Sequence, residues 1–403
     1  MKLRYQYRLY PTQRQQTELS KVFGCARVVW NDALRIACDT PKREKWPKYS
    51  ELQRRVIAQA KKTPARCWLN EISAVVLQQS VMDLNTAFKN FLESRSGKRK
   101  GRKVGFPRFK KRSNRQAVRF VKTGFSLKKN KLFLAKLGLF KVRWSRDLPS
   151  APSSVTIIKN TAGQYYASFV VEVHSKSVAP SSPSTGVDLG LKTFAFLGNK
   201  ERVESPGYTQ LPSKVKRLQR RLLRQQRGSN RRERTRLRIA KLKLRIANIR
   251  KDFLHKLSAK LVTENQVVCL EDLNVAGMLK NRKLSRAISE QGWSTFRAMC
   301  EAKAAQHDDR QVCVISRWEP TSQTCSTCGC RWGKLDLSVR LVLCVSCGTQ
   351  HDRDHNAAIN IEQSGSEHSR DSKRAMNRHK TALCGNRTAS LSHPCDTQLS
   401  LCI

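Results

Sequence analysis

The chain has 403 residues, of which 39% are hydrophobic, enough for two or three domains with their own cores. It carries 79 Lys and Arg against 30 Asp and Glu, a net charge of +49 that excludes an ordinary enzyme of small acids and favours nucleic acid. No stretch reaches the roughly 18 apolar residues of a membrane-spanning helix, and the first residues lack the apolar segment of a secretion signal. We therefore expect a protein of the reducing cytosol, in which most of the 14 cysteines are thiols or metal ligands.

The N-terminal part shows a strand pattern followed by two helical patterns. Residues 2–9 alternate apolar and polar side chains, and this period of two predicts a strand that buries one face. Pro11 ends that strand and fits the first turn of a helix. The apolar residues at helical spacing are Leu19, Val22, Phe23, Ala26, Val29, Trp30 and Leu34 in the first helix and Leu77, Val81, Leu84, Phe88 and Phe91 in the second. We interpret both stripes as helix-packing core.

A run of basic residues follows the second helix. Residues 95–115 contain eleven Lys or Arg and no acid, with Phe106 and Phe109 among them. A flexible, solvated loop is the simpler interpretation of a charge run, but a run this dense fits better along nucleic-acid phosphates. The candidate contact residues here are Arg99, Lys100, Arg102, Lys103, Arg108, Lys110, Lys111 and Arg112.

Short strands and a linker come next. Residues 131–144 and 154–173 are predicted strands, the second set a hairpin that turns at residues 160–163. We expect them to pair with the N-terminal strand in a small β-barrel, between whose parts the N-terminal helices are inserted. Residues 174–185 are rich in Ser and Pro, which is typical of a linker between domains.

Three acidic residues stand at strand ends or at a helix start. Asp188 lies in an apolar strand, Glu271 ends a second apolar strand, and Asp354 precedes an apolar helix. A carboxylate in a buried strand is costly unless a cation neutralises it. We prefer Glu271 over Asp272, because strand alternation turns neighbouring side chains to opposite faces. We prefer Asp354 over Asp352, which suits a helix N-cap, and both choices stay open at this point.

Together these acids resemble the site of the RuvC nucleases, which have a ribonuclease H-like fold. Phosphodiester hydrolysis requires stabilisation of charge on the attacking and leaving oxygens, and two Mg²⁺ ions roughly 4 Å apart supply it. Mg²⁺ prefers oxygen ligands and keeps several of its waters. One carboxylate must bridge both ions with one more on either side, and Asp188 is the candidate bridge.

A strongly basic helical hairpin lies between the first two acids. Residues 214–260 hold nineteen Lys or Arg against Glu233 and Asp252, and residues 228–230 divide them into two helices. Because a solvated surface normally mixes both signs of charge, an almost uniformly positive face predicts contact with phosphates. The candidate contact residues are Arg217, Arg220, Arg221, Arg224, Arg231 and Arg238.

Four cysteines form the most specific motif of the chain. Cys325 and Cys328 precede Cys344 and Cys347, with two residues inside each pair and fifteen between the pairs. This spacing is typical of one structural Zn²⁺ bound tetrahedrally by four thiolates. Cys330 falls outside the spacing, and we interpret it as a spare thiol.

The order of these motifs is similar to the TnpB (OrfB) family of insertion-sequence proteins. The segments that carry the likeness are GVDLGLKTFA, LEDLNVAGM, TCSTCG, CVSCG and HDRDHNAAINI, with YRLYPTQRQQTELSKVFGCARVVWN and FPRFKKR toward the N-terminus. The likeness covers nearly the whole chain, to about residue 365. It implies an RNA-guided DNA endonuclease related to the type V CRISPR effectors. Such a protein binds a guide RNA from the transposon end, reads a short adjacent motif on duplex DNA and cuts with one RuvC-like site.

By this resemblance Asp188, Glu271 and Asp354 are the Mg²⁺-binding catalytic residues, and the four cysteines bind zinc. The implied fold class is α/β plus β-barrel: a RuvC-like nuclease domain with an inserted zinc ribbon, and a wedge-type β-barrel with an inserted helical recognition lobe. The implied boundaries are 1–10 and 116–173 for the barrel, 11–115 for the recognition lobe, 186–318 and 350–363 for the nuclease domain and 319–349 for the ribbon. Residues 364–403 lack periodicity and are expected to be disordered.

The expected partners are a guide RNA and double-stranded target DNA, with a transposon-encoded companion transposase as a further candidate. The expected location is the bacterial or archaeal cytoplasm, at the nucleoid. Two alternatives stay open: a transposase that cuts and rejoins the ends of its element, and a non-catalytic nucleic-acid-binding regulator. No serine or tyrosine nucleophile motif favours the first, and the presence of all three acids argues against the second.

Overall fold

The computed structural model describes residues 1–41, 46–99, 101–113, 115–175, 179–180, 182–208, 210–336 and 338–385, with side chains described to residue 369. The chain divides into two compact units, Met1–His174 with Pro212–Leu244 and Ser175–Leu211 with Arg245–Ile403. Within the described ranges, no helix is both long and apolar enough to cross a bilayer.

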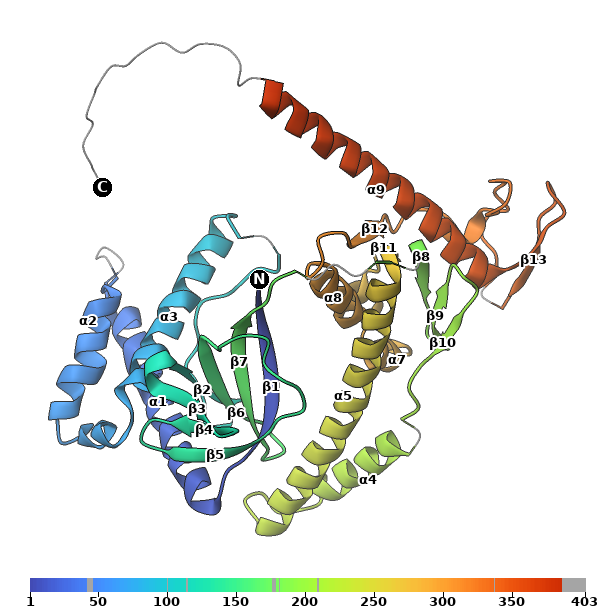
Figure 1. The fold of residues 1–403 in the computed structure, drawn as a ribbon. Helices are drawn as coiled ribbons and strands as arrows, with labels where there is room; N and C mark the ends of the chain where they lie inside the picture. Colours follow the sequence, from blue (N-terminus) through green and yellow to red (C-terminus); the bar gives the residue numbers. More distant parts are fainter. Residues whose placement is uncertain are drawn as a thin grey trace, which may run out of the picture. The chain divides into compact units, whose positions relative to one another are not determined.

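The first unit is built on a seven-stranded antiparallel sheet (Figure 1). Its strands are β1 (Lys2–Tyr10), β2 (Gln116–Val121), β3 (Phe125–Lys128), β4 (Lys131–Leu134), β5 (Gly138–Arg143), β6 (Ser154–Lys159) and β7 (Tyr165–Glu172), in the order β2-β6-β7-β1-β5-β4-β3. β1 buries Tyr7 and Leu9 and exposes Arg4 and Gln6, which confirms the predicted strand. The predicted hairpin corresponds to β6 and β7, which pair in antiparallel fashion.

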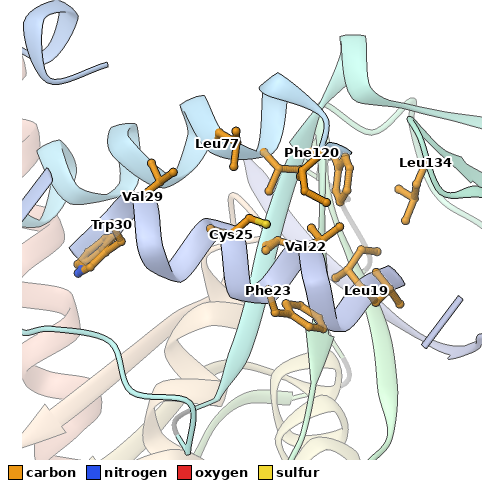
Figure 2. Close-up of a cluster of buried hydrophobic side chains, with 14 of the residues drawn as sticks. Leu19, Val22, Phe23, Cys25, Val29, Trp30, Leu77, Phe120 and Leu134 are labelled. Carbon is orange, nitrogen blue, oxygen red and sulfur yellow. The ribbon is translucent and has the colours of Figure 1, made fainter. Parts of the chain in front are cut away.

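This sheet is an open half-barrel, whereas the sequence predicted a small β-barrel. β2 and β3 are its two end strands, and no pairing joins them in the described part of the chain. Two helices, α1 (Gln13–Asp39) and α3 (Ala74–Arg95), place their apolar stripes in the same core as Phe120 and Leu134 of the sheet (Figure 2). The helices therefore cover apolar side chains that further strands would cover in a closed barrel.

Both predicted N-terminal helices form, and their stripes are buried. A capping box begins α1: Gln15 N donates to Thr12 Oγ1 at 3.3 Å, and Thr12 N donates to Gln15 Oε1 at 3.0 Å. Leu19, Leu77 and Leu84 are fully buried. Shorter turns lie between and after the helices: α2 (Tyr49–Gln53), the π-helical η1 (Arg54–Gln59) and the 3₁₀-helical η2 (Ala60–Lys62), η3 (Cys67–Glu71) and η4 (Lys122–Gly124).

The basic helical hairpin also forms, but much of it belongs to the first unit. Its helices, α4 (Leu211–Leu223) and α5 (Asn230–Glu264), are joined by a turn at Gly228, whose φ is +84°. Pro212–Leu244 belongs to the first unit, whereas the sequence placed all of residues 214–260 in the nuclease domain. The difference arises because one unbroken helix, α5, contributes residues to both units.

The second unit contains a five-stranded mixed sheet. Its strands are β8 (Ser182–Leu189), β9 (Thr193–Leu197), β10 (Arg202–Glu204), β11 (Asn265–Glu271) and β12 (Gln311–Ile315), in the order β10-β9-β8-β11-β12. β8, β11 and β12 are parallel to one another, and β9 and β10 are antiparallel additions. β8 begins inside the predicted linker of residues 174–185, because Ser182 and Ser184 pair with β11. β9 pairs with the other end of β8, so Pro183 does not interrupt that ladder.

Helices cover both faces of this sheet. The remaining elements are α6 (Val275–Met278), α7 (Ser285–Gln291), α8 (Trp293–Ala304), η5 (Thr321–Gln323), the ribbon strands β13 (Leu341–Leu343) and β14 (Gln350–Asp352), and α9 (Arg353–Gly385). Val268 and Leu270 of β11 share a core with α5, α7 and α8, whereas Val267 and Cys269 pack with Ile361 of α9. Successive side chains of β11 therefore point into two different cores, one on each face of the sheet.

The helix α9 approaches β8 very closely. A Cβ atom at Gly186 would lie 2.0 Å from Ala358 O and 2.6 Å from Glu362 N. The Glu362 carboxylate accepts hydrogen bonds from Ser184 Oγ at 2.7 Å and from the Gly186 amide at 3.3 Å. Glycine at this position therefore provides the space in which the helix lies.

The sequence predicted disorder from residue 364 onward. α9 continues to Gly385, so this prediction is wrong for residues 364–385. Gly365 packs so closely on Cys269 that a Cβ there would lie 2.4 Å from its sulfur, and Ser369 donates to Gln311 Oε1 at 2.9 Å. Small and polar residues make these contacts, so no apolar stripe revealed the helix. The C-terminal residues after α9 lie outside the described chain.

Replacing Gly186 with Ala should destabilise the second unit, because the added methyl group has no space between β8 and α9. Overpacking of this kind costs about 1–3 kcal/mol, so thermal unfolding followed by circular dichroism should begin at a lower temperature. Gly105→Ala is the matched control, since no atom lies within 4 Å of a Cβ there. Identical unfolding curves for the two variants would contradict the close packing.

Candidate active site and metal centre

Three acidic side chains from separate segments line one pocket of about 310 Å³ in the second unit. Asp188 lies near the end of β8, Glu271 is the last residue of β11, and Asp354 is in the first turn of α9. β8 and β11 are parallel neighbours with Leu270 opposite Val187, so their carboxyl ends meet at the same edge of the sheet. The structure thus brings together the three acids that were selected from the sequence.

Strand alternation decides which side chains reach this pocket. On β8, Val187 joins the core with α5 and α8, so Gly186 and Asp188 face the side of the sheet on which α9 lies. On β11, Cys269 packs with α9, and Glu271 two residues later shares its face. Both acids therefore point toward the face that the start of α9 covers.

Asp272 and Asp352, the two alternatives, are engaged elsewhere. Asp272 is not among the residues that line the pocket, and its carboxylate forms ion pairs with Arg317 and, at 2.9 Å, with Arg297. Hydrogen bonds from Arg317 and then Arg297 hold the pKa of Asp272 below its usual range. Asp352 caps α9, because its Oδ1 accepts hydrogen bonds at 3.0 and 3.2 Å from the amides two and three residues later.

The pocket concentrates negative charge that the chain does not fully compensate. Burial raises the pKa of Asp188 to about 7, and the carboxylates of Glu271 and Asp354 add to the shift. Burial also raises the pKa of Glu271, with smaller contributions from Asp272 and Glu319. Carboxylates that repel one another in this way, with hard oxygen donors, fit a divalent cation, whose charge would restore their ionised forms.

The ligand oxygens of these three acids do not all lie within 4.8 Å of one another. Among the described residues, the four cysteines are the group whose ligand atoms all lie within 4.8 Å of one another, and the three acids are not part of such a group. The oxygen donors fit a divalent cation.

Further charged side chains in the pocket were not singled out by the sequence. They are Arg317, Glu319, Arg340 and Arg353. Arg340 donates to both oxygens of Asp354, at 2.8 and 3.0 Å, and so balances the charge of that carboxylate. Their one signal in the sequence is position: Glu319 lies just before the first cysteine pair and Arg340 just before the second.

The four cysteines form a compact cluster in the ribbon. The Sγ atoms of Cys328 and Cys344 are 3.6 Å apart, and those of Cys325 and Cys347 are 3.7 Å apart. Tetrahedral zinc with Zn–S bonds of about 2.3 Å places sulfurs about 3.8 Å apart, so these residues fit the ion. The side-chain and backbone hydrogen bonds of Thr349 lower the pKa of Cys347 to about 6, which favours the thiolate form that binds metal.

Buried amides attach the ribbon to the start of α9. Asn356 is 1% exposed: its Oδ1 accepts from Ser326 N at 2.8 Å, and its Nδ2 donates to Thr324 O at 2.7 Å. Asn360 Nδ2 donates to Thr321 O at 2.7 Å and to Thr324 O at 2.8 Å. The cysteine cluster and the acid in the first turn of α9 are therefore held in one arrangement.

The residues predicted to contact nucleic acid are distributed over two segments of the first unit. Lys100 lies outside the described residues, and Lys110 is half-buried. The exposed members are Arg99, Arg102, Lys103, Arg108, Lys111 and Arg112 in the loop after α3, and Arg217, Arg220, Arg221, Arg224, Arg231 and Arg238 on α4 and α5. Their exposure leaves them free to reach a polyanion.

Part of the basic loop is fastened to α1. Asn31 brackets the backbone of Lys110 with hydrogen bonds of 2.8 and 3.1 Å, and Trp30 Nε1 donates to Arg108 O at 3.1 Å. The Lys110 Nζ lies 3.6 Å from the centre of the Trp30 ring, and burial lowers its pKa to about 8. A loop that is flexible throughout, the simpler interpretation of the sequence, does not describe this part.

Known proteins with similar sequences cover nearly the whole chain. A relative from Streptomyces pristinaespiralis, named as an RNA-guided DNA endonuclease, is 38% identical over 378 residues, which are 91% of this chain and 90% of the relative. The chain belongs to the TnpB (OrfB) family. Residues 168–282 match the OrfB family described as "Probable transposase", residues 1–45 match its helix-turn-helix domain, and residues 293–361 match the Cas12f1-like TNB domain.

One further relative and one solved structure also match most of the chain. A relative from Escherichia coli (strain K12), named as the RNA-guided DNA endonuclease InsQ, is 30% identical over 382 residues, 90% of this chain and 92% of the relative. A cryo-EM structure of the Cas12f1–sgRNA–target DNA complex matches with a TM-score of 0.52 at 15% identity, over 86% of this chain and 81% of that one. At this identity the match shows a shared fold.

Removing the charge of Asp188 should stabilise this TnpB-like protein when divalent cations are absent. Its pKa is about 7 in the folded chain against an ordinary value of 3.8. Between pH 3.8 and about 7, the Asp188 carboxyl is therefore protonated in the folded chain and ionised in the unfolded chain. The free energy of unfolding falls as the pH rises through this range. Near pH 8, Asp188→Asn should unfold at a higher temperature than the wild type. Its free energy of unfolding should be larger by no more than about 4 kcal/mol.

The measurement is thermal unfolding near pH 5 and pH 8 in Mg²⁺-free buffer. The wild type should lose stability between the two pH values, and Asp188→Asn should lose less. Asp252→Asn is the control, because that acid is exposed on α5 and pairs with Lys256 at 2.8 Å. Added Mg²⁺ should stabilise the wild type more than Asp188→Asn, and equal shifts in both would contradict cation binding by this carboxylate.

The purified full-length TnpB-like chain should contain one zinc ion. Cys344→Ala should reduce the zinc content, measured by mass spectrometry of the metal, to near zero, because three thiolates leave the tetrahedral site incomplete. Cys330→Ser is the matched control and should keep the ion, since this residue stands outside the four-cysteine cluster. Loss of zinc from the control alone would reverse the assignment.

Proposed function

We propose that this TnpB-like protein is an RNA-guided DNA endonuclease that hydrolyses phosphodiesters of target DNA in the acidic pocket of its second unit. The observation that carries the proposal is the convergence of Asp188, Glu271 and Asp354 on one pocket, where burial, together with the charges of the other two carboxylates, raises the pKa of Asp188. The names of the relatives from Streptomyces pristinaespiralis and Escherichia coli support an RNA guide and a DNA substrate.

The three acids would share the ligation of two Mg²⁺ ions. Asp188 has both other carboxylates as neighbours and would bridge the ions, with Glu271 and Asp354 on either side. Bound Mg²⁺ would activate the attacking water and stabilise the leaving oxygen. The same pocket carries guanidinium groups on Arg317, Arg340 and Arg353, which match the non-bridging oxygens of a phosphodiester.

The basic residues of the first unit would hold the nucleic acids. Twelve of the fourteen candidates are exposed arginines or lysines, and their uniform sign favours contact with phosphates over contact with bases. A protein that grips backbone in this way can leave sequence selection to pairing between guide and target. We therefore assign the guide RNA and the RNA–DNA duplex to these surfaces, and the reading of a short adjacent DNA motif to the same protein.

The zinc ribbon would have a structural role. Its four thiolates leave no open coordination position for a substrate, which is typical of structural zinc. The amide contacts of Asn356 and Asn360 with the ribbon link its folding to the position of Asp354. The companion transposase stays a prediction.

The test is cleavage by the complex that the protein forms in cells. The chain is expressed with the DNA that flanks its gene and purified, and any discrete RNA that accompanies it is sequenced. The complex is then incubated with duplex DNA that matches the RNA, with Mg²⁺. The wild type should cut, and Asp188→Ala should cut at least about 100-fold more slowly, because the bridging ligand is lost. Asp252→Asn should cut at the wild-type rate.

The products separate this proposal from the alternatives. Hydrolysis leaves free DNA ends, whereas a strand-transfer transposase joins an element end to a new site. Binding without cutting by the wild type would favour a regulator. Cutting that persists in Asp188→Ala would remove the proposed site, and the absence of any discrete RNA would remove the guide.

A further inference from the structure

An exposed tryptophan stands in the loop beside the acidic pocket. Trp318 is 86% exposed and lies between Arg317 and Glu319, both of which line the pocket. An indole ring is one of the largest apolar surfaces a protein can bury, so leaving it in water forgoes considerable stabilisation. A ring in this position calls for a ligand with a flat, apolar face.

The loop that carries the ring has a defined conformation. Glu319 N donates to Ser316 O at 3.2 Å, and Ser316 N donates back to Glu319 Oε1 at 3.3 Å. Trp318 N donates to Ser316 Oγ at 3.3 Å, and Arg317 is tied to Asp272 by its ion pair. The backbone on both sides of the ring is therefore fixed, so the indole is presented in one region of the surface.

The topology of the sheet places this loop at the edge where the acids meet. β12 runs parallel to β11 with Ile315 opposite Glu271, and Asp272 N donates to Ile315 O at 3.1 Å. The chain leaves β12 at that point, passes through Trp318 and returns to the pocket wall at Glu319. The ring is thus three residues from a backbone position that is paired with a proposed metal ligand.

We propose that Trp318 stacks on an unpaired nucleobase of the DNA strand that is cut and so fixes which phosphodiester enters the pocket. The inference rests on the proposed endonuclease function. A strand drawn into a pocket for one phosphodiester has unpaired bases beside it, and every base offers a flat face to an aromatic ring. Stacking is also independent of charge, which matters beside a pocket whose carboxylates repel phosphates until cations are bound.

The direct test uses 2-aminopurine, a fluorescent base whose emission falls when it stacks. The base is placed at successive positions on either side of the scissile bond in target DNA bound to the full RNA–protein complex. Asp188→Ala is present throughout, so that the DNA stays intact. At one position the emission should be low with Trp318, low with Trp318→Phe and high with Trp318→Ala. Val345→Ala is the control, because Val345 is 92% exposed on the ribbon and lies outside the pocket lining.

The kinetic test uses the catalytically intact complex. Trp318→Ala should cut roughly 10- to 100-fold more slowly under single-turnover conditions and spread the cuts over neighbouring phosphodiesters, as expected when one base stack is lost. Trp318→Phe should recover most of the rate and the single cut position. Zinc content and unfolding temperature should match the wild type in both variants.

The proposal is overturned if no 2-aminopurine position responds to Trp318→Ala, or if the rate and the cut position are unchanged. A fall in zinc content or unfolding temperature would assign the ring a structural role, and a change in oligomeric state would assign it to a protein contact. If the wild type neither binds RNA nor cuts, the endonuclease proposal fails. The stacking contact can still be tested in that case, by measuring the affinity of the RNA-free protein for a short single-stranded oligonucleotide. Trp318→Ala should weaken this affinity, and Val345→Ala should leave it unchanged.

Discussion

The packing of α9 on β8 is the constraint on which the second unit depends. Glu362 is bonded to Ser184, Ala358 lies over Gly186, and Asp354 reaches the pocket that contains Asp188. Four helical residues rise about 6 Å, and two strand residues extend about 6.6 Å. The helix and the strand run antiparallel with nearly the same rise between successive contacts. A helix held at Glu362 therefore places Asp354, in its first turn, beside Asp188 near the end of β8. Gly186 is the residue that lets the two backbones come this close.

The protein separates its charges by function. Much of its positive excess lies in the basic loop and the α4–α5 hairpin, whereas four acids, beside Arg317, Arg340 and Arg353, line one pocket of the second unit. The ligand types are separated as well: soft thiolates gather within 4.8 Å of one another in the ribbon, and hard carboxylates line the pocket. Zinc and magnesium differ in the donors that they prefer, so each set suits one ion and disfavours the other.

Short-range patterns account for what could be predicted from the sequence. The period of β1, the stripes of α1 and α3 and the spacing of the cysteines are local, and each corresponds to an element that the structure contains. Strand parity alone distinguished Glu271 from Asp272. What could not be predicted depends on contacts between distant segments: the open end of the half-barrel, the helix that continues through Gly365, and the reach of Arg340 across to Asp354. A single glycine or arginine forms no periodic pattern in the sequence, so the sequence does not indicate which distant segment it will contact.

The ribbon explains why part of the pocket was missed. The chain between β12 and α9 supplies Glu319, Arg340 and the exposed Trp318, so one wall of the pocket comes from the segment that the cysteines fold. A ribbon this small has little apolar core of its own, and the free energy of metal binding contributes directly to its folding. Asn356 then transmits that order to α9 through its bonds to the first cysteine turn. Loss of a metal from the four cysteines would leave the two strand acids in place but would disorder the part of the pocket lining that carries Glu319 and Arg340, so the acidic pocket would depend on the ribbon.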